Sequence, residues 1–448
     1  MDAPSAAKPA ATRLFYRQWQ LITEPHRFFD ALASEYGDFA YYRGLIPFYF
    51  VNDAERVKQI LKQTTVRFDK RTPLYRRFRG VFRSGLVVSE GDHWQRQRRL
   101  MQPMFAPAAL KRYFGVMDDC VTEFQSRWDR LAADGSAFDL FSETSNLTLE
   151  VAGRSLFSDG FEGARDEIEQ WSRRIARYSA LPPLPPLDDV RIPTPLNLRM
   201  QRDMRRFRQF VQDKIDARRS QPDTDDLLTR LMQAARDEGS PISDGELVDE
   251  VVTMIFGGFE TSSMALVWFW YLMSRHPDVE TRILDEINTT LGERRPERAD
   301  LANLPLLRAS IEEALRLYPP FWFENRRATE AVDLGGYTIP AGAMVVFSRH
   351  ALHRSPHYWR EPATFRPERF LADAAEPVHR FASVPFGGGP RQCIGMSFAM
   401  MELMLTLART LPRYRLFTDA SGDIDTVSSL TLEPSRRLQA TLTRRDTV

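Results

Sequence analysis

Cysteine is nearly absent from this sequence. Its 448 residues include two cysteines, Cys120 and Cys393, which are too few for a framework of disulfide bonds and lack the CxxC spacing of a zinc pair. Lysine is also scarce, because only six of the 61 basic residues are lysines and the rest are arginines. The low cysteine content suits a reducing compartment, so we expect a cytoplasmic protein.

Long hydrophobic runs and an excess of charge are missing as well. The longest apolar run, MALVWFWYLM (264–273), is too short to cross a bilayer, and the first dozen residues lack the apolar stretch of a signal peptide. The formal net charge is +1, which gives no general attraction to polyanions. We therefore expect neither a membrane span nor binding to nucleic acid.

Helical periodicity dominates what the sequence does contain. Apolar residues at three- and four-residue spacing predict helices over 106–132, 141–156, 161–179, 197–219, 243–275 and 277–291. Short strands are predicted over 39–43 and 48–52, with a hairpin over 332–347 that turns at Gly335 and Gly336. The prediction is a mainly α protein with small β-sheets. The proline-rich segment 181–195 indicates either a stiff connector between helices or a site that recruits a partner domain.

Three consecutive glycines stand just before Cys393, in the stretch PFGGGPRQCIG (385–395). An apolar helix is predicted directly afterwards, so the cysteine lies near a helix N-terminus, where exposed N–H groups and the helix dipole favour a thiolate. The glycines allow a tight turn and the close approach of a flat ligand, and Arg391 is near enough to pair with a carboxylate on that ligand. The alternative is a structural cysteine in a glycine turn.

The segment 243–275 is predicted to be one unusually long helix that opens with a capping box, Ser243 and Glu246. Gly257 and Gly258 in its middle each cost about 1 kcal/mol relative to alanine. A planar cofactor pressed against the helix would account for them, and so would close packing of two helices. An acid and an alcohol follow in the same apolar helix, where a glutamate is costly unless it is hydrogen-bonded or used in chemistry.

These motifs resemble those of the cytochrome P450 superfamily. Residues 386–395 fill every fixed position of its haem-binding signature, F-x-x-G-x-R-x-C-x-G. GGFETS (257–262) resembles its oxygen-activation motif, IEEALR (311–316) its E-x-x-R helix, and YWREPATFRPERF (358–370) the pattern that follows. The resemblance implies the P450 fold, with haem between the long central helix and the cysteine loop with its helix. It also implies a flexible tail over 1–20 and one catalytic domain over 21–448.

The resemblance assigns roles to single residues. Cys393 would be the axial thiolate ligand of the iron of haem b, with Phe386 packed beside the sulfur. Thr261 would hydrogen-bond the bound oxygen, and Glu260 would relay protons. The implied buried structural network is Glu313, Arg316 and Arg369. The residues implied in haem binding are Cys393, Phe386, Gly387, Arg391, Gly395, Trp94, Arg98, His93, Arg326, Gly257 and Gly258.

Such a protein would be a monooxygenase that inserts one oxygen atom from O2, by hydroxylation or epoxidation, into a lipophilic substrate such as a terpene, fatty acid, steroid or polyketide. About fifty residues follow Cys393, too few for a reductase domain, so electrons are expected from a separate ferredoxin or flavodoxin with its reductase. By position, the residues expected to line the substrate pocket are Leu74, Phe78, Val81, Phe82, Leu86, Val87, Phe256, Phe259, Phe321, Trp322, Phe323, Leu430 and Leu432.

Three other functions stay open at this point. The same fold can serve a peroxygenase or isomerase that needs no external electrons, and a haem protein can act as a sensor or carrier without catalysis. The pair Glu260 and Thr261 argues against both, since neither needs a proton relay. A helical interaction module recruited through 181–195 would leave the cysteine loop unexplained.

Overall fold

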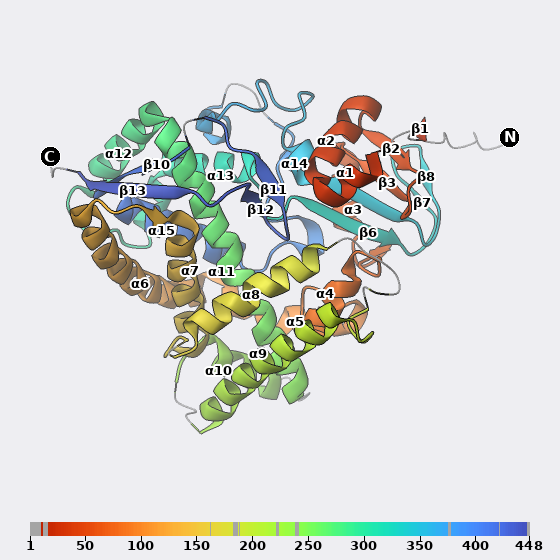
Figure 1. Ribbon diagram of the computed structural model, residues 1–448, viewed down its shortest axis with the longest axis horizontal. Coiled ribbons are helices and arrows are strands. Elements are labelled where there is room, and N and C mark those ends of the chain that lie inside the picture. Colours follow the sequence, from red (N-terminus) through yellow and green to blue (C-terminus); the bar gives the residue numbers. More distant parts are fainter. Residues whose placement is uncertain are drawn as a thin grey trace.

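The computed structural model describes residues 10–11, 17–161, 163–181, 187, 189–220, 224–237, 242–374, 378–420 and 422–445. Helices make up most of this part of the chain, and the strands gather in small sheets (Figure 1). Most of the predicted N-terminal tail and six positions of the proline-rich segment (182–186 and 188) lie outside the described residues.

The helices fall close to the segments that periodicity predicts. The exception is α8, which begins four residues later than expected because Gly160 and Gly163 take positive φ values of +67° and +73° in a turn before it. In chain order the helices are α1 (Gln18–Thr23), α2 (Pro25–Tyr36), α3 (Ala54–Gln63), α4 (Tyr75–Phe82), α5 (Gly91–Met101), α6 (Pro107–Asp134), α7 (Leu140–Phe157), α8 (Arg165–Ala180), α9 (Pro195–Arg219), α10 (Leu227–Asp237), α11 (Asp244–Arg275), α12 (Pro277–Leu291), α13 (Pro305–Leu317), α14 (Arg349–Leu352) and α15 (Met396–Thr410).

The strands form four sheets in the described part of the chain, with orders β1-β2-β3-β9-β6-β4, β10-β13-β5, β11-β12 and β7-β8. Their bounds are β1 (Ala10–Ala11), β2 (Phe39–Tyr42), β3 (Phe48–Val51), β4 (Phe68–Asp69), β5 (Phe138–Asp139), β6 (Phe323–Ala328), β7 (Val332–Asp333), β8 (Thr338–Ile339), β9 (Met344–Ser348), β10 (Tyr414–Thr418), β11 (Thr426–Ser428), β12 (Leu432–Pro434) and β13 (Gln439–Arg444). The largest sheet and the β10-β13-β5 sheet lie on opposite sides of the molecule (Figure 1).

The predicted hairpin over 332–347 is only partly correct. β7 and β8 pair antiparallel around Gly335 and Gly336, whose φ values of +63° and +86° suit the turn. β9, which supplies the end of the predicted hairpin, pairs instead with β3 and β6 in the largest sheet. The alternation of apolar residues indicates a strand, but it does not identify the strand's partner.

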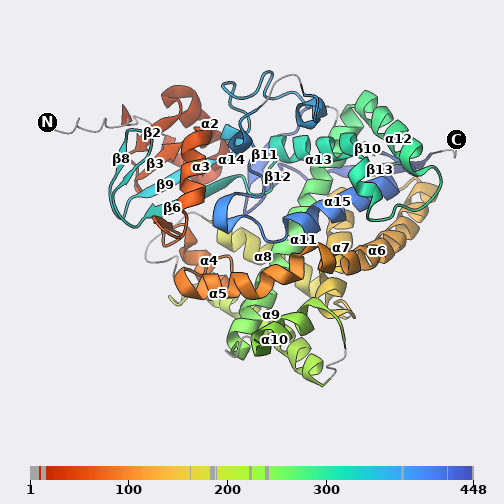
Figure 2. The same ribbon diagram turned by 180° about the vertical axis from the view of Figure 1, so that it is seen from behind.

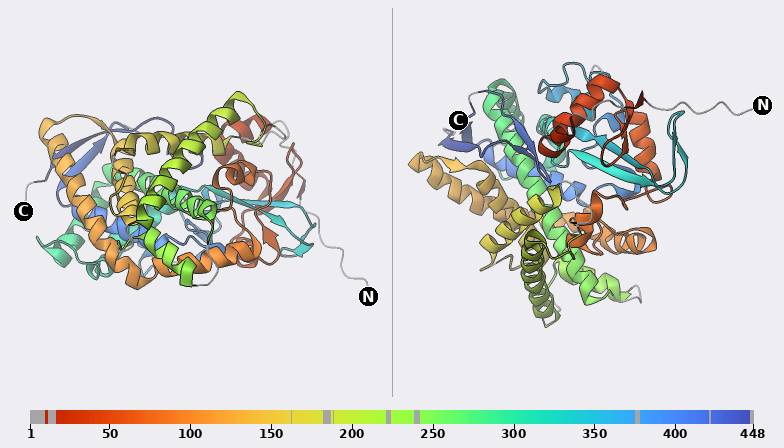
Figure 3. Two further views of the ribbon diagram at one scale, coloured as in Figure 1. Left: turned by 90° about the horizontal axis from the view of Figure 1, so that it is seen from below. Right: turned by 45° about the vertical axis from the view of Figure 1, so that its right-hand side comes forward.

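Helix α11 runs through the whole molecule (Figure 3). Its predicted capping box is confirmed: Ser243 accepts from the N–H of Glu246, and the Glu246 carboxylate accepts from the N–H of Ser243 at 2.9 Å. By length and composition α11 could span a membrane, but 72% of its most apolar window is buried against the rest of the fold. Its apolar residues are therefore core residues, packed chiefly on α7.

Candidate active site

The loop before α15 lies in the middle of the molecule (Figure 2), where it contacts α3, while α15 itself contacts α11. Gly387 and Gly389 in this loop have φ values of +70° and +65°. A side chain at position 389 would place its Cβ 2.2 Å from the carbonyl oxygen of Leu61 in α3. The glycines therefore serve both the turn and its close packing on α3.

Cys393 is the thiol that this loop presents, two residues before Gly395, the N-cap of α15. The Cys393 side chain is accessible, yet protein atoms surround it on all sides. It therefore borders a space inside the protein. The N–H of Cys393 donates to the carbonyl oxygen of Phe386 at 2.9 Å. Burial raises the pKa of the Cys393 thiol, whereas the N–H of Gly395 and the charges of Arg98 and Arg349 act to lower it. A metal cation at the sulfur would complete the stabilisation of a thiolate.

One side of α11 is open at the centre of the molecule. Gly257 is exposed, and a Cβ there would meet no heavy atom of the described chain within 4 Å. Thr261 follows one turn later, and its hydroxyl donates to the Gly257 carbonyl oxygen at 2.9 Å. A Cβ on Gly258 would instead lie 3.6 Å from the Cβ of Ala152 in α7. The structure thus differs from the prediction for Gly258, which packs two helices together, while Gly257 faces the open side.

Glu260 points into a different environment from Thr261. Its carboxyl is buried, and Oε1 accepts a hydrogen bond from the Thr431 hydroxyl at 3.2 Å. Burial, together with the nearby charge of Glu433, raises the pKa of Glu260 to about 8. Near neutral pH this side chain is therefore largely a carboxylic acid that holds a proton within the core.

A buried cationic cluster lies between the cysteine loop and the start of α5. The Arg391 guanidinium lies 4.1 Å from the centre of the Trp94 ring and donates to Glu90 at 2.7 Å. Its Nε and Nη1 atoms are buried and find no hydrogen-bond partner among the described residues. Arg98, on the same helix as Trp94, donates to the carbonyl oxygen of Gln392 at 2.9 Å. Trp94, Arg98 and Arg391, all predicted from the sequence, therefore lie close together here. The unused N–H groups of Arg391 can donate to an acceptor outside the chain.

The same cluster continues onto β6, where Glu324 forms ion pairs with both Arg326 and Arg349. Lys70 adds a fourth basic side chain, and burial, with help from Arg326 and Arg391, holds its pKa well below the usual range. Four basic side chains (Lys70, Arg326, Arg349 and Arg391) therefore face two carboxylates (Glu90 and Glu324). Haem b carries two propionates, so the residues present fit this cofactor in charge as well as in hydrogen-bond donors.

Sequence analysis missed Lys70, Glu90, Glu324 and Arg349. One signal was available, because Glu324 and Arg326 are two residues apart on a strand and so share a face. His93 is the opposite case. Its ring lies 3.3 Å from the carbonyl oxygen of Ser84 and 3.6 Å from Glu246, near the start of α11. These contacts place His93 beside Glu246 and Ser84, and its part in haem binding stays a prediction.

The predicted residues Glu313, Arg316 and Arg369 contact one another, and Glu313 and Arg316 are fully buried. Arg316 donates to both carboxylate oxygens of Glu313, at 2.6 and 2.8 Å, and Arg369 lies 3.3 Å from the same carboxylate. Arg316 also donates to the carbonyl oxygens of His353 (2.6 Å) and Pro362 (2.8 Å). These carbonyls belong to the segment that precedes the cysteine loop, so the network ties α13 to that segment.

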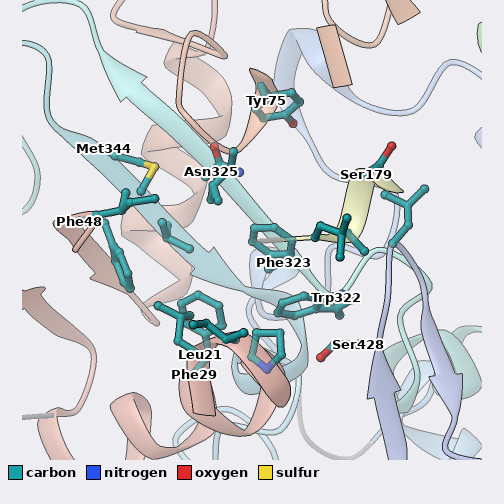
Figure 4. Close-up of a pocket in the computed structure, with 18 of the residues that line it drawn as sticks. Leu21, Phe29, Phe48, Tyr75, Ser179, Trp322, Phe323, Asn325, Met344 and Ser428 are labelled. Atoms are coloured by element: carbon teal, nitrogen blue, oxygen red, sulfur yellow. The ribbon is translucent and has the colours of Figure 1, made fainter. Parts of the chain in front are cut away.

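An apolar cavity of about 240 Å³ opens beside the cationic cluster, between α1, α2, α8, β6 and the β11–β12 turn. Figure 4 shows Trp322 and Phe323 in its centre, with Leu21 and Phe29 on one side and Ser179 on the other. Seven of the predicted pocket residues line it: Leu74, Phe78, Val87, Phe321, Trp322, Phe323 and Leu430. The contribution of α1, α2 and β3 was missed, because nothing in the sequence indicates that the N-terminal elements fold back over the pocket.

Six predicted pocket residues do not line this cavity, and their place in the substrate pocket stays a prediction. Phe82 and Phe256 pack edge-to-face at 5.2 Å, and Leu432 is buried with its carbonyl oxygen bound to the Trp268 indole. Phe259 borders a second cavity instead. The six are Val81, Phe82, Leu86, Phe256, Phe259 and Leu432, all of them buried.

The fold and this site define a haem-thiolate protein, and comparison with known proteins agrees. The family model of cytochrome P450 matches residues 8–440. The chain belongs to the cytochrome P450 family, and it is a P450 monooxygenase of the type that carries a thiolate-ligated haem.

Several relatives are similar over most of their length. Pentalenene oxygenase of Streptomyces avermitilis is 34% identical over 98% of this chain and 97% of its own. Cyclooctat-9-en-7-ol 5-monooxygenase of Streptomyces melanosporofaciens is 35% identical over 91% of this chain and 88% of its own. Among solved structures, the haem domain of cytochrome P450DA superposes with a TM-score of 0.87 at 25% identity, covering 99% of this chain and 98% of that one.

Proposed function

We propose that this enzyme inserts one oxygen atom from O2, by hydroxylation or epoxidation, into a terpene-like substrate. The observation that carries this proposal is the cavity beside the cationic cluster. Its lining is mostly apolar, and its polar residues are Gln18, Tyr42, Tyr75, Ser179, Asn325, Ser428 and Ser429. Two relatives that match most of the chain are named as oxygenases of pentalenene and of cyclooctat-9-en-7-ol, which agrees with a compact, lipophilic substrate. We also infer a separate ferredoxin or flavodoxin, with its reductase, as the electron donor.

Haem b, when bound, supplies the activation of dioxygen. Cys393 would supply the thiolate ligand, since an N–H group of Gly395 and the positive charges of Arg98 and Arg349 act on its sulfur. Arg391 would hold a propionate with the donors it leaves unused, and the other cations of the cluster would serve the rest of the cofactor's charge.

The open side of α11, which carries Gly257 and Thr261, would face the site of substrate oxidation. Thr261 presents a hydroxyl there that donates to the Gly257 carbonyl oxygen, and the hydroxyl oxygen can accept a hydrogen bond from a water. Glu260, next along the helix, keeps a proton in the core because of its raised pKa. We infer that Glu260 would deliver protons to the Thr261 side, where the oxidation chemistry that the haem supplies would consume them.

Substitution Thr261→Ala tests this role. We expect reduced nicotinamide to be consumed at a similar rate while product falls about ten-fold or more and hydrogen peroxide rises, because general acid–base transfer contributes roughly 10²–10⁴-fold. Thr261→Ser, which keeps the hydroxyl, is the matched control and should stay close to the wild type. Equal coupling in Thr261→Ala and the wild type would remove Thr261 from the mechanism.

The two cysteines give an equally direct test of the cofactor. The reduced protein under carbon monoxide should show the strongly red-shifted Soret band of a thiolate-ligated haem. Cys393→Ala should lose this band, and Cys120→Ala, which changes a buried residue of α6, should keep it. A band that is indifferent to Cys393 would overturn the assignment.

We further propose one catalytic domain over 21–448 and a soluble, cytoplasmic location. A single large hydrophobic core joins α4 to α13 with α15 and the C-terminal strands, which supports the one-domain proposal. The burial of α11 and the two free cysteines support the location.

A further inference from the structure

A second cavity, of about 230 Å³, lies against α11, where Phe259, Glu260, Met264 and Val267 line it. Unlike the apolar cavity, it is rich in charge. Arg173 and Arg177 reach it from α8, Arg436 and Arg437 from the segment before β13, and Glu433 from β12. It therefore offers a polar surface that ends at the acid of the oxygen-activation motif.

Thr431 stands between the two acids of this cavity. Its hydroxyl oxygen lies 3.2 Å from Oε1 of Glu260 and 3.5 Å from Oε1 of Glu433. A hydroxyl group has one hydrogen to donate but can accept from a second group. It can satisfy both carboxyls only when one of them is protonated and donates to the Thr431 oxygen. Glu260 Oε2 is buried and has no partner among the described residues, so a second charge at this site would be poorly solvated.

Hydrogen bonds to the backbone of its turn hold Thr431 in position. The turn that carries it joins β11 to β12, and two buried indoles hold this turn: Trp322 donates to the Ser429 carbonyl oxygen at 3.0 Å, and Trp268 donates to that of Leu432 at 2.8 Å. The Leu432 N–H also donates to the Pro320 carbonyl oxygen at 2.9 Å. A hydroxyl held this firmly can serve as a fixed bridge between two carboxyls.

We propose that Glu260, Thr431 and Glu433 form a proton-sharing relay, in which Glu433 takes up protons from the polar cavity and Thr431 passes them to Glu260. In one transfer, the Glu433 carboxylic acid gives its proton to the Thr431 oxygen while the Thr431 hydroxyl hydrogen moves to Oε1 of Glu260. Glu433 becomes a carboxylate and Glu260 a carboxylic acid, with no change in oxidation state. Glu433 and Thr431 are positioning and relay residues, and the onward step from Glu260 rests on the proposed function.

The electrostatics of the cavity agree with this order. Burial raises the pKa of Glu433, while a hydrogen bond from Ser429 and the charges of Arg177 and Arg173 act to lower it. Glu433 lines the cavity, so it can exchange protons with it. Burial also raises the pKa of Glu260 to about 8, and the charge of Glu433 adds to that rise. Arg436 and Arg437 are held outward by Asp419 and Asp139, so the α8 arginines are the cations that face the pair most directly.

An infrared titration of the carboxyl groups in the haem-loaded enzyme tests the pair without turnover. Glu250 and Glu402 also have pKa values of about 8, so the spectrum of Glu260→Gln is subtracted to isolate the Glu260 band. Glu433→Gln removes a like charge and should move the Glu260 titration to lower pH. Thr431→Val removes a hydrogen bond to the carboxylate and should move it to higher pH, and Thr431→Ser should leave it in place. An unchanged titration in Glu433→Gln would overturn the proposal.

Turnover in ordinary and heavy water then tests the relay. In Glu433→Gln we expect substrate affinity and haem content as in the wild type, product per electron pair reduced about ten-fold, and a larger solvent isotope effect. Thr431→Val should do the same and Thr431→Ser should restore wild-type coupling. If Glu433→Gln makes as much product per electron pair as the wild type, the relay is refuted and the proposed function is not. If the wild-type enzyme makes no product from any substrate, the proposed function is refuted, and the infrared result still applies.

Discussion

The ion pair of Glu313 and Arg316 gives the sharpest stability prediction. Both side chains are completely buried, at 2.6 and 2.8 Å from each other, and the carboxylate also accepts from the Arg366 N–H at 2.9 Å. Glu313→Gln leaves a buried guanidinium without its counter-charge. We expect a loss of about 3–5 kcal/mol in the free energy of unfolding, the cost of breaking a buried pair on one side only.

Loss of the arginine should cost at least as much for a different reason. Arg316→Met removes the donor shared by the carbonyl oxygens of His353, Pro362 and Thr364, and each buried acceptor left without a donor costs about 1–3 kcal/mol. Glu313 would keep Arg369 at 3.3 Å, which limits the penalty on the carboxylate side.

Chemical denaturation followed by far-ultraviolet circular dichroism measures these losses, on samples with equal haem loading. The double variant Glu313→Gln with Arg316→Met should be about 2 kcal/mol or more less destabilised than the sum of the two single variants, because it leaves no unpaired charge at positions 313 and 316. Glu361→Gln, which removes an exposed partner of Arg366, is the control and should cost less than about 1 kcal/mol. A cost below about 1 kcal/mol for Glu313→Gln, or strict additivity, would refute the reasoning.

Three further predictions follow from single contacts. Burial, with His350 nearby, lowers the pKa of His26 to about 4. As the pH falls, the unfolded chain therefore binds a proton at this histidine before the folded chain does, and about 3 kcal/mol of stability should be lost between pH 6.5 and pH 4. In His26→Gln, the denaturation midpoint should depend less on pH over this range. Gly389→Ala, which collides with Leu61, should cost more than about 2 kcal/mol, whereas Gly336→Ala, strained but with open space, should cost about 1 kcal/mol. Phe78→Ala should change substrate-induced spectral shifts with little loss of stability. Phe82→Ala removes a ring that packs on Phe256 and should lower the free energy of unfolding by about 3–5 kcal/mol. Equal effects of the two glycine substitutions, or of the two phenylalanine substitutions, would contradict these assignments.

The sequence predicted well wherever the chemistry lies within one short segment. The capping box of α11, the turn at Gly335 and Gly336 and the position of Cys393 before α15 all depend on residues a few places apart. Backbone geometry over such distances follows from local rules, so a motif carries its own structure with it. The family followed from the same motifs, because their residues must be close in space to hold one cofactor.

The tertiary structure decided everything that depends on which face of an element meets which neighbour. Gly257 and Gly258 are adjacent in the sequence, yet one faces open space and the other packs on α7, because successive helix residues point about 100° apart. The approach of Glu433 to Glu260 joins residues that lie 173 positions apart, and no period or motif predicts that contact. Burial and pairing of this kind are properties of the packed fold, because the field and the solvent around a side chain are set by its distant neighbours.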